Sequence, residues 1–313
     1  MFQLIKQAFA EFSEDKCMRM AAALAYYTVF SLAPLMIIVM MICGLIWDPS
    51  DVEGLVQQEI RSVVGENGAE QVRTMLRNAS QSDRGILASV LSGVMLLVGA
   101  TGLVGQLQGA LNDAWEVKPD PEQGGLWNFV TKRLLSFGMI CGIAFLLLVS
   151  LIASSVLAAA GDTIAGWLPQ DVSQGVLMAI NLVVSLAVIV VLFGAMFKFL
   201  PDAKVAWSDV AFGAAVTGVL FVVGKFAIGA YLGSKNMEST YGAAGSLALI
   251  LIWVYYSSMI FLFGAELTQV WAKQRGSGVW PAEGAVRVVE KSVRADGAEE
   301  TSKQRERDRA LTG

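Results

Sequence analysis

Six long stretches of this chain contain almost no charged residue, and this feature limits the folds open to it. An α-helix rises about 1.5 Å per residue, so roughly 20 apolar residues cross a hydrocarbon core of about 30 Å. The stretches that reach this length are Ala21–Trp47, Gly85–Leu111, Leu134–Gly161, Val172–Phe197, Val210–Leu232 and Ser239–Ala265. Only the fifth contains a charge, Lys225. The pattern predicts an all-α polytopic membrane protein with six transmembrane helices.

Composition excludes several classes of chemistry. Hydrophobic residues make up 55% of the chain and histidine is absent, so a Ser-His-Asp triad or a histidine-based zinc site cannot be built. The cysteines, Cys17, Cys43 and Cys141, have no C-x-x-C spacing and are typical of small apolar packing residues. We expect no catalytic residues, no metal, no cofactor and no enzymatic activity. The net charge of −4 does not indicate a nucleic-acid partner.

Lysine and arginine are distributed unequally between the two sides of the predicted bundle. With six spans both termini share a side, and that side has seventeen Lys and Arg residues against five on the other. Cytoplasmic loops are enriched in these residues. The sequence therefore predicts a bacterial inner-membrane protein with cytoplasmic N- and C-termini.

Two polar regions flank or interrupt the spans. In the external segment 48–84, apolar residues recur at helical spacing on both sides of a Gly-rich break, which predicts an external hairpin of two amphipathic helices. This hairpin is interpreted as a cap over the bundle or as a membrane-remodelling or partner-binding element. From residue 276 the chain is polar, so residues 1–275 form the membrane domain and 276–313 are expected to be a disordered cytoplasmic tail or a frayed helix.

The second span carries small residues and then polar ones. Gly99, Gly102 and Gly105 are spaced for close helix packing in lipid. Toward the cytoplasmic end, Gln106 and Asp113 share one helix face and Asn112 lies beside it. This polar stripe predicts either a wet vestibule on a substrate path or interfacial snorkelling.

The last span ends at a carboxylate, Glu266, which is costly in a membrane if it is unpaired. We consider a structural ion pair, with Arg133 or Lys132 as the partner, and a substrate or proton role. Tyr26 and Tyr27, at the cytoplasmic start of the first span, fit an aromatic belt or place their hydroxyls near Glu266. Pro34 predicts a kink that serves packing or gating.

Lys225 lies inside the fifth span, in its outer half. On a helix it shares a face with small residues that include Gly218 and Gly229, so it is expected to face the bundle. It is interpreted as a structural lysine that is ion-paired or snorkels to water, or as a cation that meets an anionic substrate or lipid headgroup.

Several motifs, taken in order, resemble the YihY/BrkB family of inner-membrane proteins over about residues 10–275. The matching segments are 21–35 (AAALAYYTVFSLAPL), 108–115 (QGALNDAW), 200–207 (LPDAKVAW), 224–225 (GK), 241–245 (YGAAG) and 264–267 (GAEL). The resemblance implies a six-helix bacterial inner-membrane protein and no known reaction. Some members have been called virulence factors or ribonuclease BN; the nuclease reading is rejected, because the chain has no histidine and no loop large enough for a nuclease domain.

Two functions remain open from the sequence. One is a transporter, channel or lipid-handling permease, because ionisable residues on helices with small-residue faces usually mark pathways. The other is a non-transporting scaffold or envelope-integrity factor, in which Lys225 and Glu266 hold helices together. An intramembrane enzyme is the weakest alternative. The expected partners are membrane lipids and an anionic substrate or headgroup, and homo-oligomerisation is left open.

Overall fold

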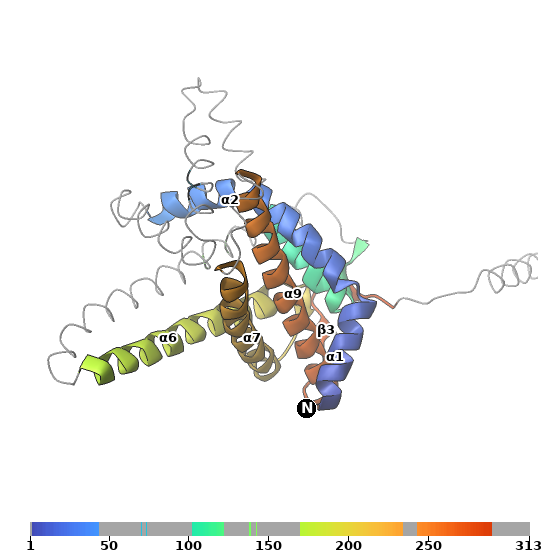
Figure 1. Ribbon diagram of the computed structural model, residues 1–313. Helices are drawn as coiled ribbons and strands as arrows, with labels where there is room; N and C mark the ends of the chain where they lie inside the picture. The colour runs from blue at the N-terminus through green and yellow to red at the C-terminus, as the bar shows by residue number, and fades with distance from the viewer. Residues whose placement is uncertain are drawn as a thin grey trace, which may run out of the picture.

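The computed structural model describes residues 2–43, 70, 73, 102–121, 138, 142, 170–233 and 243–289 of the chain. Within these ranges the protein is mostly helical (Figure 1). Its helices are α1 (Phe2–Glu14), α2 (Cys17–Cys43), α6 (Gln170–Phe199), α7 (Trp207–Gly233) and α9 (Ala243–Arg275), together with the helical residues 102–114.

Three described helices are long and apolar enough to cross a membrane. Their candidate spans are Leu182–Phe199 in α6, Trp207–Ile228 in α7 and Ile250–Arg275 in α9. These confirm the last three apolar stretches as helices. The first stretch lies largely in α2, whereas the third stretch and most of the second lie outside the described residues, as does most of the predicted external hairpin.

Helix α9 continues past the predicted end of its apolar stretch at Ala265. Ten further residues remain helical up to Arg275, because Leu267 and Val270 in this extension pack against α1. Two glycines then end the helix: the Gly278 amide donates to Ala272 at 3.0 Å, and Gly278 has a φ of 80°. This left-handed conformation is the usual glycine stop at a helix C-terminus.

Helix α1 is amphipathic and lies beside the C-terminal part of α9. Its buried residues Leu4, Ala8 and Phe12 recur every fourth position and form one face. The helix ends at Glu14, and in the turn that follows Lys16 has a φ of 56°, which is unusual for a residue with a side chain. Helix α2 begins at the next residue, so the break between α1 and α2 is a tight turn at residues 15–16.

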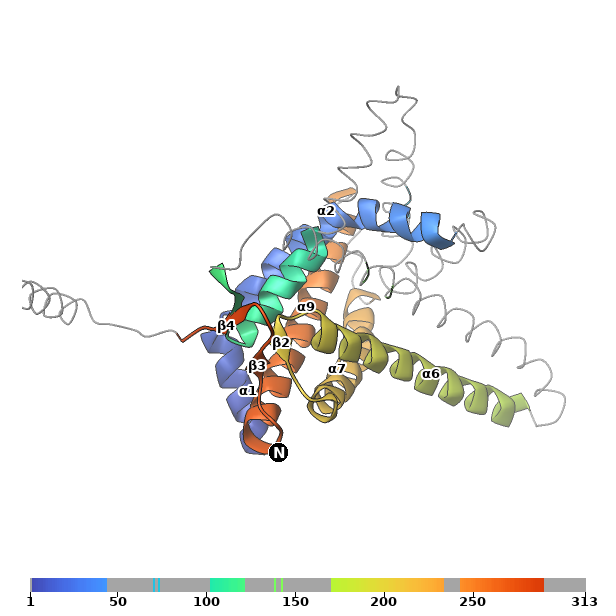
Figure 2. The same cartoon turned by 180° about the vertical axis from the view of Figure 1, so that it is seen from behind.

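Helix α7 lies between α6 and α9 and packs against both. Viewed from either side, α6 points away from the other helices, while α1 and the strands lie near the C-terminal half of α9 (Figure 2). Stacked and edge-to-face aromatic pairs link these helices, with ring centroids 5.3 Å apart for Phe197 and Phe261 and 5.7 Å apart for Phe193 and Phe221.

Two pairs of short strands accompany the helices in this mostly helical structure. Strand β1 (Val117–Pro119) pairs antiparallel with β4 (Ala285–Arg287), and β2 (Ala203–Lys204) pairs antiparallel with β3 (Trp280–Pro281). The strands β3 and β4 belong to the segment that we expected to be a disordered tail. Residues 276–289 are instead structured, because their backbone groups pair with the two loops that follow the helical residues 102–114 and α6. Residues 290–313 lie outside the described part.

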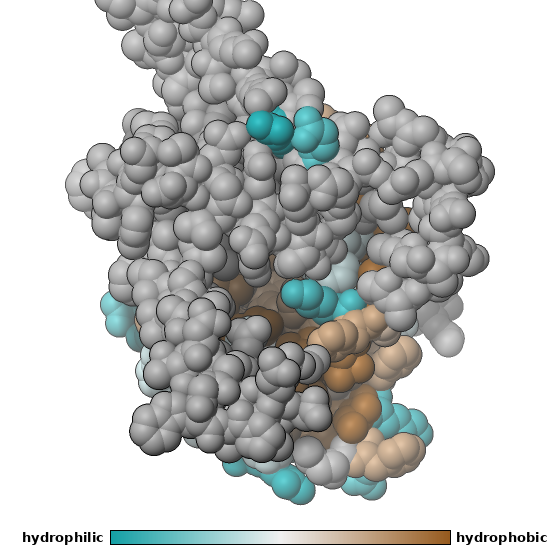
Figure 3. Space-filling model, turned by 60° about the vertical axis from the view of Figure 1, so that its left-hand side comes forward, coloured by the Kyte–Doolittle hydropathy of each residue, from teal (hydrophilic) through white to brown (hydrophobic). Residues whose placement is uncertain are grey.

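The described surface is strongly apolar where helices face outward. On α7, Val219, Val223 and Phe226 are at least half exposed and recur on one face. In Figure 3, apolar side chains (brown) gather in the lower half of the visible face, with hydrophilic residues (teal) along its lower edge. Large exposed apolar surfaces are unfavourable in water, so this face is suited to contact with lipid tails.

Candidate functional site

The site is centred on Glu266, a carboxylate buried within the candidate span of α9. Its exposed fraction is 0%, and the extension of α9 to Arg275 places it inside the helix rather than at its end. The Cys17 thiol donates a hydrogen bond to Glu266 Oε1 at 3.3 Å. The other oxygen, Oε2, is buried and has no hydrogen-bond donor among the described N–H, O–H and S–H groups.

Asp15 is the second carboxyl group of the site. It lies in the turn between α1 and α2, is half-buried, and its side chain lies within hydrogen-bonding reach of the Glu266 side chain. The two carboxyl groups can form a hydrogen bond only if one of them carries a proton. Burial raises the pKa of Asp15 to about 6; the hydrogen bond to Glu266 opposes this rise, while the negative charges of Glu11, Glu116 and Glu14 add to it.

Gln269 lies three residues beyond Glu266, on the same side of α9. It is 1% exposed, and neither its amide nitrogen nor its amide oxygen has a hydrogen-bond partner among the described residues. Four residues further along, Lys273 is exposed and forms an ion pair with Glu116 at 3.5 Å. Glu266, Gln269 and Lys273 therefore form a polar stripe that runs from the buried interior of α9 to its exposed end.

The helices around Glu266 pack without intervening space. Thr217 of α7 lies against Gly264 of α9, and Thr268 of α9 lies against Gly213 of α7, so a Cβ at either glycine would overlap a threonine side chain. Each threonine hydroxyl donates to the carbonyl of the glycine four residues earlier in its own helix, at 2.6 Å and 2.7 Å. The two helices thus cross through a reciprocal pair of Gly-x-x-x-Thr segments.

A polar pair joins two of the motifs singled out in the sequence. The Asn112 side-chain amide donates to Asp202 Oδ2 at 2.8 Å, and the Asp202 backbone N–H donates to Asn112 Oδ1 at 2.8 Å. Gln108 also donates to Asp202. Asn112 is 5% exposed, so it fixes the end of its helix to the loop after α6. Its neighbour Asp113 is exposed, and Gln106 is half-buried.

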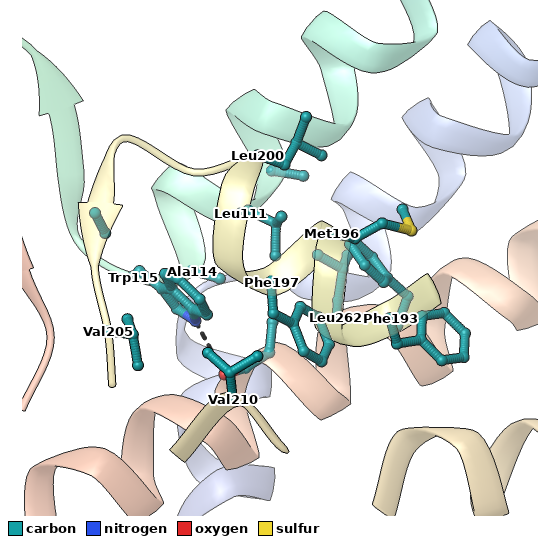
Figure 4. Close-up of a cluster of buried hydrophobic side chains, with 14 of the residues drawn as sticks. Leu111, Ala114, Trp115, Phe193, Met196, Phe197, Leu200, Val205, Val210 and Leu262 are labelled. Atoms are coloured by element: carbon teal, nitrogen blue, oxygen red, sulfur yellow. Dashed lines mark hydrogen bonds between the residues drawn. The ribbon is translucent and has the colours of Figure 1, made fainter. Parts of the chain in front are cut away.

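Trp115 anchors the same region to α9. It is 1% exposed, and its indole N–H donates to the Ala265 carbonyl at 3.0 Å. Figure 4 shows this bond as a dashed line, with Trp115 among buried side chains that come from four parts of the chain: Leu111, Ala114, Phe193, Met196, Phe197, Leu200, Val205, Val210 and Leu262. The backbone next to Glu266 is therefore held in place by a fully buried indole.

Lys225 is half-buried on α7, next to Gly224, which packs against Tyr256. Among the described residues Lys225 has no hydrogen bond or ion pair. Of the small residues expected on its face, Gly218 is buried and packs against Val190 of α6. Lys225 thus lies at the edge of the packed face of α7 rather than at its centre.

Other predicted residues have different environments. Tyr26 and Tyr27 are 59% and 44% exposed and contact each other edge to face, so their hydroxyls do not bind Glu266. A Cβ at Gly102 or Gly105 would meet no described atom within 4 Å, which leaves their packing role a prediction. Pro34 lies within α2, a helix that changes direction along its length (Figure 1).

Some predictions concern residues that the structure does not describe, or residues of which it describes the backbone and not the packing. Gly99, Lys132 and Arg133 are outside it, and the packing of Gly229 is not described. The expected ion pair of Glu266 with Lys132 or Arg133 therefore stays a prediction. Two other cations on the predicted cytoplasmic side do not reach Glu266: Lys198 donates to the Val205 carbonyl and lies 5.5 Å from the Trp207 ring centre, and Arg19 is exposed.

The sequence analysis did not identify Asp15, Cys17 or Gln269 as site residues. Asp15 follows Glu11 and Glu14 and so looks like part of a solvated acidic surface. Gln269 did carry a signal, since it is a polar residue three positions from Glu266 and would share its helix face if the helix continued. Because the apolar stretch ends at Ala265, the sequence does not predict that the helix continues and that Glu266 and Gln269 lie on the same face of it.

Comparison with known proteins identifies the family. The profile of the family described as virulence factor BrkB matches residues 8–285. The chain belongs to this family. The match extends past residue 275, the end of the segment whose motifs resemble the family, and includes strand β3 and the start of β4. That extension fits the pairing of β3 and β4 with β2 and β1.

Relatives of this BrkB-family chain are membrane proteins. It is 25% identical to a UPF0761 membrane protein of Psychrobacter sp. strain PRwf-1, over 90% of this chain and 50% of the relative. It is 28% identical to a UPF0761 membrane protein of Teredinibacter turnerae, over 87% of this chain and 61% of the relative. The chain thus spans about half to three-fifths of these relatives. No solved structure matches it. The chain is an integral membrane protein of the BrkB/UPF0761 family.

Proposed function

We propose that this protein is a membrane transporter or permease and that Glu266 is the ionisable group on its translocation path. The observation that supports this proposal is the environment of Glu266. The side chain is 0% exposed, is in contact with a second carboxyl group, and has no cation partner among the described residues. Unpaired charges inside a membrane domain are expensive and generally mark ion or substrate pathways.

A purely structural role explains this environment less well. A structural carboxylate is normally stabilised by a cation or by several donors, whereas Glu266 has a weak thiol donor and another acid. Its packing partners, in contrast, are well satisfied: the hydroxyls of Thr217 and Thr268 and the indole of Trp115 all have acceptors. In the part of the chain that the structure describes, the buried polar atoms without a hydrogen-bond partner include three at Glu266 and Gln269, and one, Ser257 Oγ, elsewhere on α9.

One observation favours the alternative, a non-transporting scaffold. The reciprocal Gly–Thr crossing leaves no free volume between α7 and α9 beside Glu266, and transport requires helices that move apart or rock. In the transport proposal α9 moves relative to the turn between α1 and α2, where Asp15 and Cys17 lie. The tightly packed helices α7 and α9 then move together as one unit.

The proposal includes a six-helix topology in a bacterial inner membrane, with segment 48–84 as an external helical hairpin and both termini in the cytoplasm. Asp209 at the start of α7 accepts a hydrogen bond from the Ser277 amide just after α9. This contact supports placing the start of α7 and the end of α9 at one membrane surface. Single-cysteine labelling of intact cells tests this topology. The background is free of cysteine, and Cys17→Ser keeps a hydrogen-bond donor to Glu266 at position 17. Gln170→Cys should label from outside, and Glu283→Cys only after permeabilisation; the opposite result contradicts the topology.

The proposed partners are lipids and an anionic solute or headgroup that meets Lys225, with no nucleic acid and no enzymatic reaction. Purified protein in liposomes, screened for movement of ions, organic anions and labelled lipids, tests transport. Glu266→Gln should abolish the activity, while Glu283→Gln, which changes an exposed carboxylate, should retain it. Equal activity in both variants would exclude Glu266 from the path, and no transport of any probe would favour the scaffold.

A further inference from the structure

The strongest unexplained feature of the molecule is the set of unsatisfied polar atoms beside Glu266. Among the described residues no amide, hydroxyl or thiol group donates to Glu266 Oε2, and neither amide atom of Gln269 has a partner, although both residues are at most 1% exposed. Buried polar groups are nearly always hydrogen-bonded to protein or to ordered water. The two amide atoms of Gln269, one helical turn from Glu266, therefore indicate a bound species beside the carboxyl group.

The chemistry of these atoms identifies the species. The Gln269 amide nitrogen is a donor and needs an acceptor, while Gln269 Oε1 and Glu266 Oε2 are acceptors and need donors. A metal cation would leave the amide donor unsatisfied. Water satisfies all three atoms, because it donates two hydrogen bonds and accepts two, and buried waters typically make about three such bonds.

The carboxyl groups of Asp15 and Glu266 can hold a proton beside Gln269. The ionisable groups that act on the pKa of Asp15 are acids: Glu266 of α9, Glu11 and Glu14 of α1, and Glu116 before β1; Glu266 also contacts the Cys17 thiol of α2. Lys273, further along α9, is exposed and paired with Glu116, and no cation of the described residues forms an ion pair with Asp15 or Glu266. Close carboxyl groups in such surroundings hold a proton in common rather than both ionising.

We propose that Asp15, Glu266 and Gln269 form a hydrated proton-binding site through which this protein takes up protons from the cytoplasmic side. This inference rests on the proposed transport function and names its coupling ion. Asp15 is half-buried and so reaches solvent, whereas Glu266 does not. Asp15 is thus the entrance and Glu266 the acceptor.

The transfer itself requires no other reactant. Asp15 takes a proton from a hydronium ion on the cytoplasmic side, which leaves a water molecule, and that proton moves across the hydrogen bond to Glu266. The O–H bond of Asp15 breaks, the O–H bond of Glu266 forms, and Asp15 is left as a carboxylate that can be protonated again. Water held by Gln269 connects Glu266 to its surroundings. The Cys17 thiol donates to Glu266 Oε1 throughout and keeps the carboxyl plane oriented.

Infrared difference spectroscopy of the purified protein in lipid nanodiscs tests the site without measuring transport. The pH is varied between about 4 and about 8, an interval that begins near the ordinary carboxyl pKa. The wild-type protein should show the C=O band of a protonated, buried carboxyl group that titrates within this interval. The band should change in frequency or intensity in Glu266→Gln and in Asp15→Asn, disappear in the double variant Glu266→Gln/Asp15→Asn, and be unchanged in the control Glu283→Gln.

Deuterium exchange tests the water. On transfer to D2O the wild-type band should shift quickly, and Gln269→Leu, which keeps the side-chain bulk but removes both amide atoms, should slow this shift several-fold. The proposal is overturned if the wild-type protein shows no such titrating band, or if the band persists in the double variant Glu266→Gln/Asp15→Asn. The wild-type measurement decides the matter even if that variant does not fold. If the titrating band is present but the protein transports nothing in liposomes, the proton-binding site stands and the proposed transport function is wrong.

Discussion

Thr217 of α7 lies directly against the backbone of Gly264 of α9, and the same contact recurs with the helices exchanged between Thr268 and Gly213. At this crossing a glycine of each helix thus packs against a β-branched threonine of the other helix. Both threonines are 0% exposed. Because Glu266 lies between Gly264 and Thr268 in the sequence, this crossing determines where its carboxylate can be.

A methyl group at either glycine should destabilise the protein. Gly264→Ala and Gly213→Ala each force a Cβ into a threonine side chain, and overpacking of this kind costs about 1–3 kcal/mol. Thermal unfolding in detergent should show a lower Tm for both. Gly194→Ala is the matched control, since its Cβ would lie 3.7 Å from that of Ala214, an ordinary contact. Thr217→Ala should partly restore Gly264→Ala; an unchanged Tm for Gly264→Ala would show that the helices are not this close.

Removing the Asn112 side-chain amide should weaken the attachment of its helix to the loop after α6. Asn112→Ala removes both hydrogen bonds between the two residues, each 2.8 Å long in the native protein, and takes away the acceptor of the Asp202 backbone N–H; the loss of a partner of this kind costs about 1–3 kcal/mol. Chemical unfolding measures the loss. Asp113→Ala, at the exposed neighbouring position, should change the free energy of unfolding by less than about 0.5 kcal/mol. Equal effects of the two substitutions would refute the role assigned to Asn112.

The stability of the protein should fall as Asp15 ionises. Its pKa rises from 3.8 to about 6 on folding, so the folded state binds the proton more tightly than the unfolded state. The resulting stabilisation is complete below about pH 4 and is lost as the pH rises through about 6. Melting curves across this window should show a falling Tm for the wild type and a flatter dependence for Asp15→Asn. Parallel curves for the two proteins would mean that Asp15 is not protonated preferentially in the folded state.

Lys225 should matter for transport of an anionic substrate and not for folding. It is half-buried at the edge of the packed face of α7 and has no partner among the described residues, so truncation removes a charge without breaking an ion pair. Lys225→Ala should lose transport in liposomes at an unchanged Tm, and Lys225→Arg should retain part of it. If Lys225→Ala fails to fold, or folds and remains fully active, the lysine is structural or dispensable.

The apolar stretches could be predicted because a membrane span is a local property of about 20 consecutive residues. The contacts of the site are not local. Cys17 and Glu266 are 249 positions apart, and nothing in the sequence around Asp15 distinguishes it from Glu11 or Glu14. The strands have two or three residues each, too few for any alternation to be visible. The substrate-path role predicted for Asn112 stays a prediction, and its hydrogen bonds could not be foreseen because its partner Asp202 follows a different helix.

The end of α9 shows how one boundary affects an interpretation. Hydropathy falls after Ala265, so the sequence placed Glu266 at the membrane surface, where a lysine or arginine partner is expected. The helix in fact continues because its next turns pack against α1 through Leu267 and Val270. That tertiary contact puts Glu266 in the interior, beside Asp15 rather than a described cation.

Proton flux into liposomes tests the central claim, that Glu266 is the ionisable group on a transport path, most directly. Protein is reconstituted into vesicles that contain a pH-sensitive dye, an inward proton gradient is imposed, and the anionic solute identified by the transport screen is added. The wild type and Glu283→Gln should acidify the lumen when the solute is present, and Glu266→Gln should show only the leak of protein-free vesicles. If folded Glu266→Gln acidifies the lumen as fast as the wild type, Glu266 is not on the path and the account is wrong.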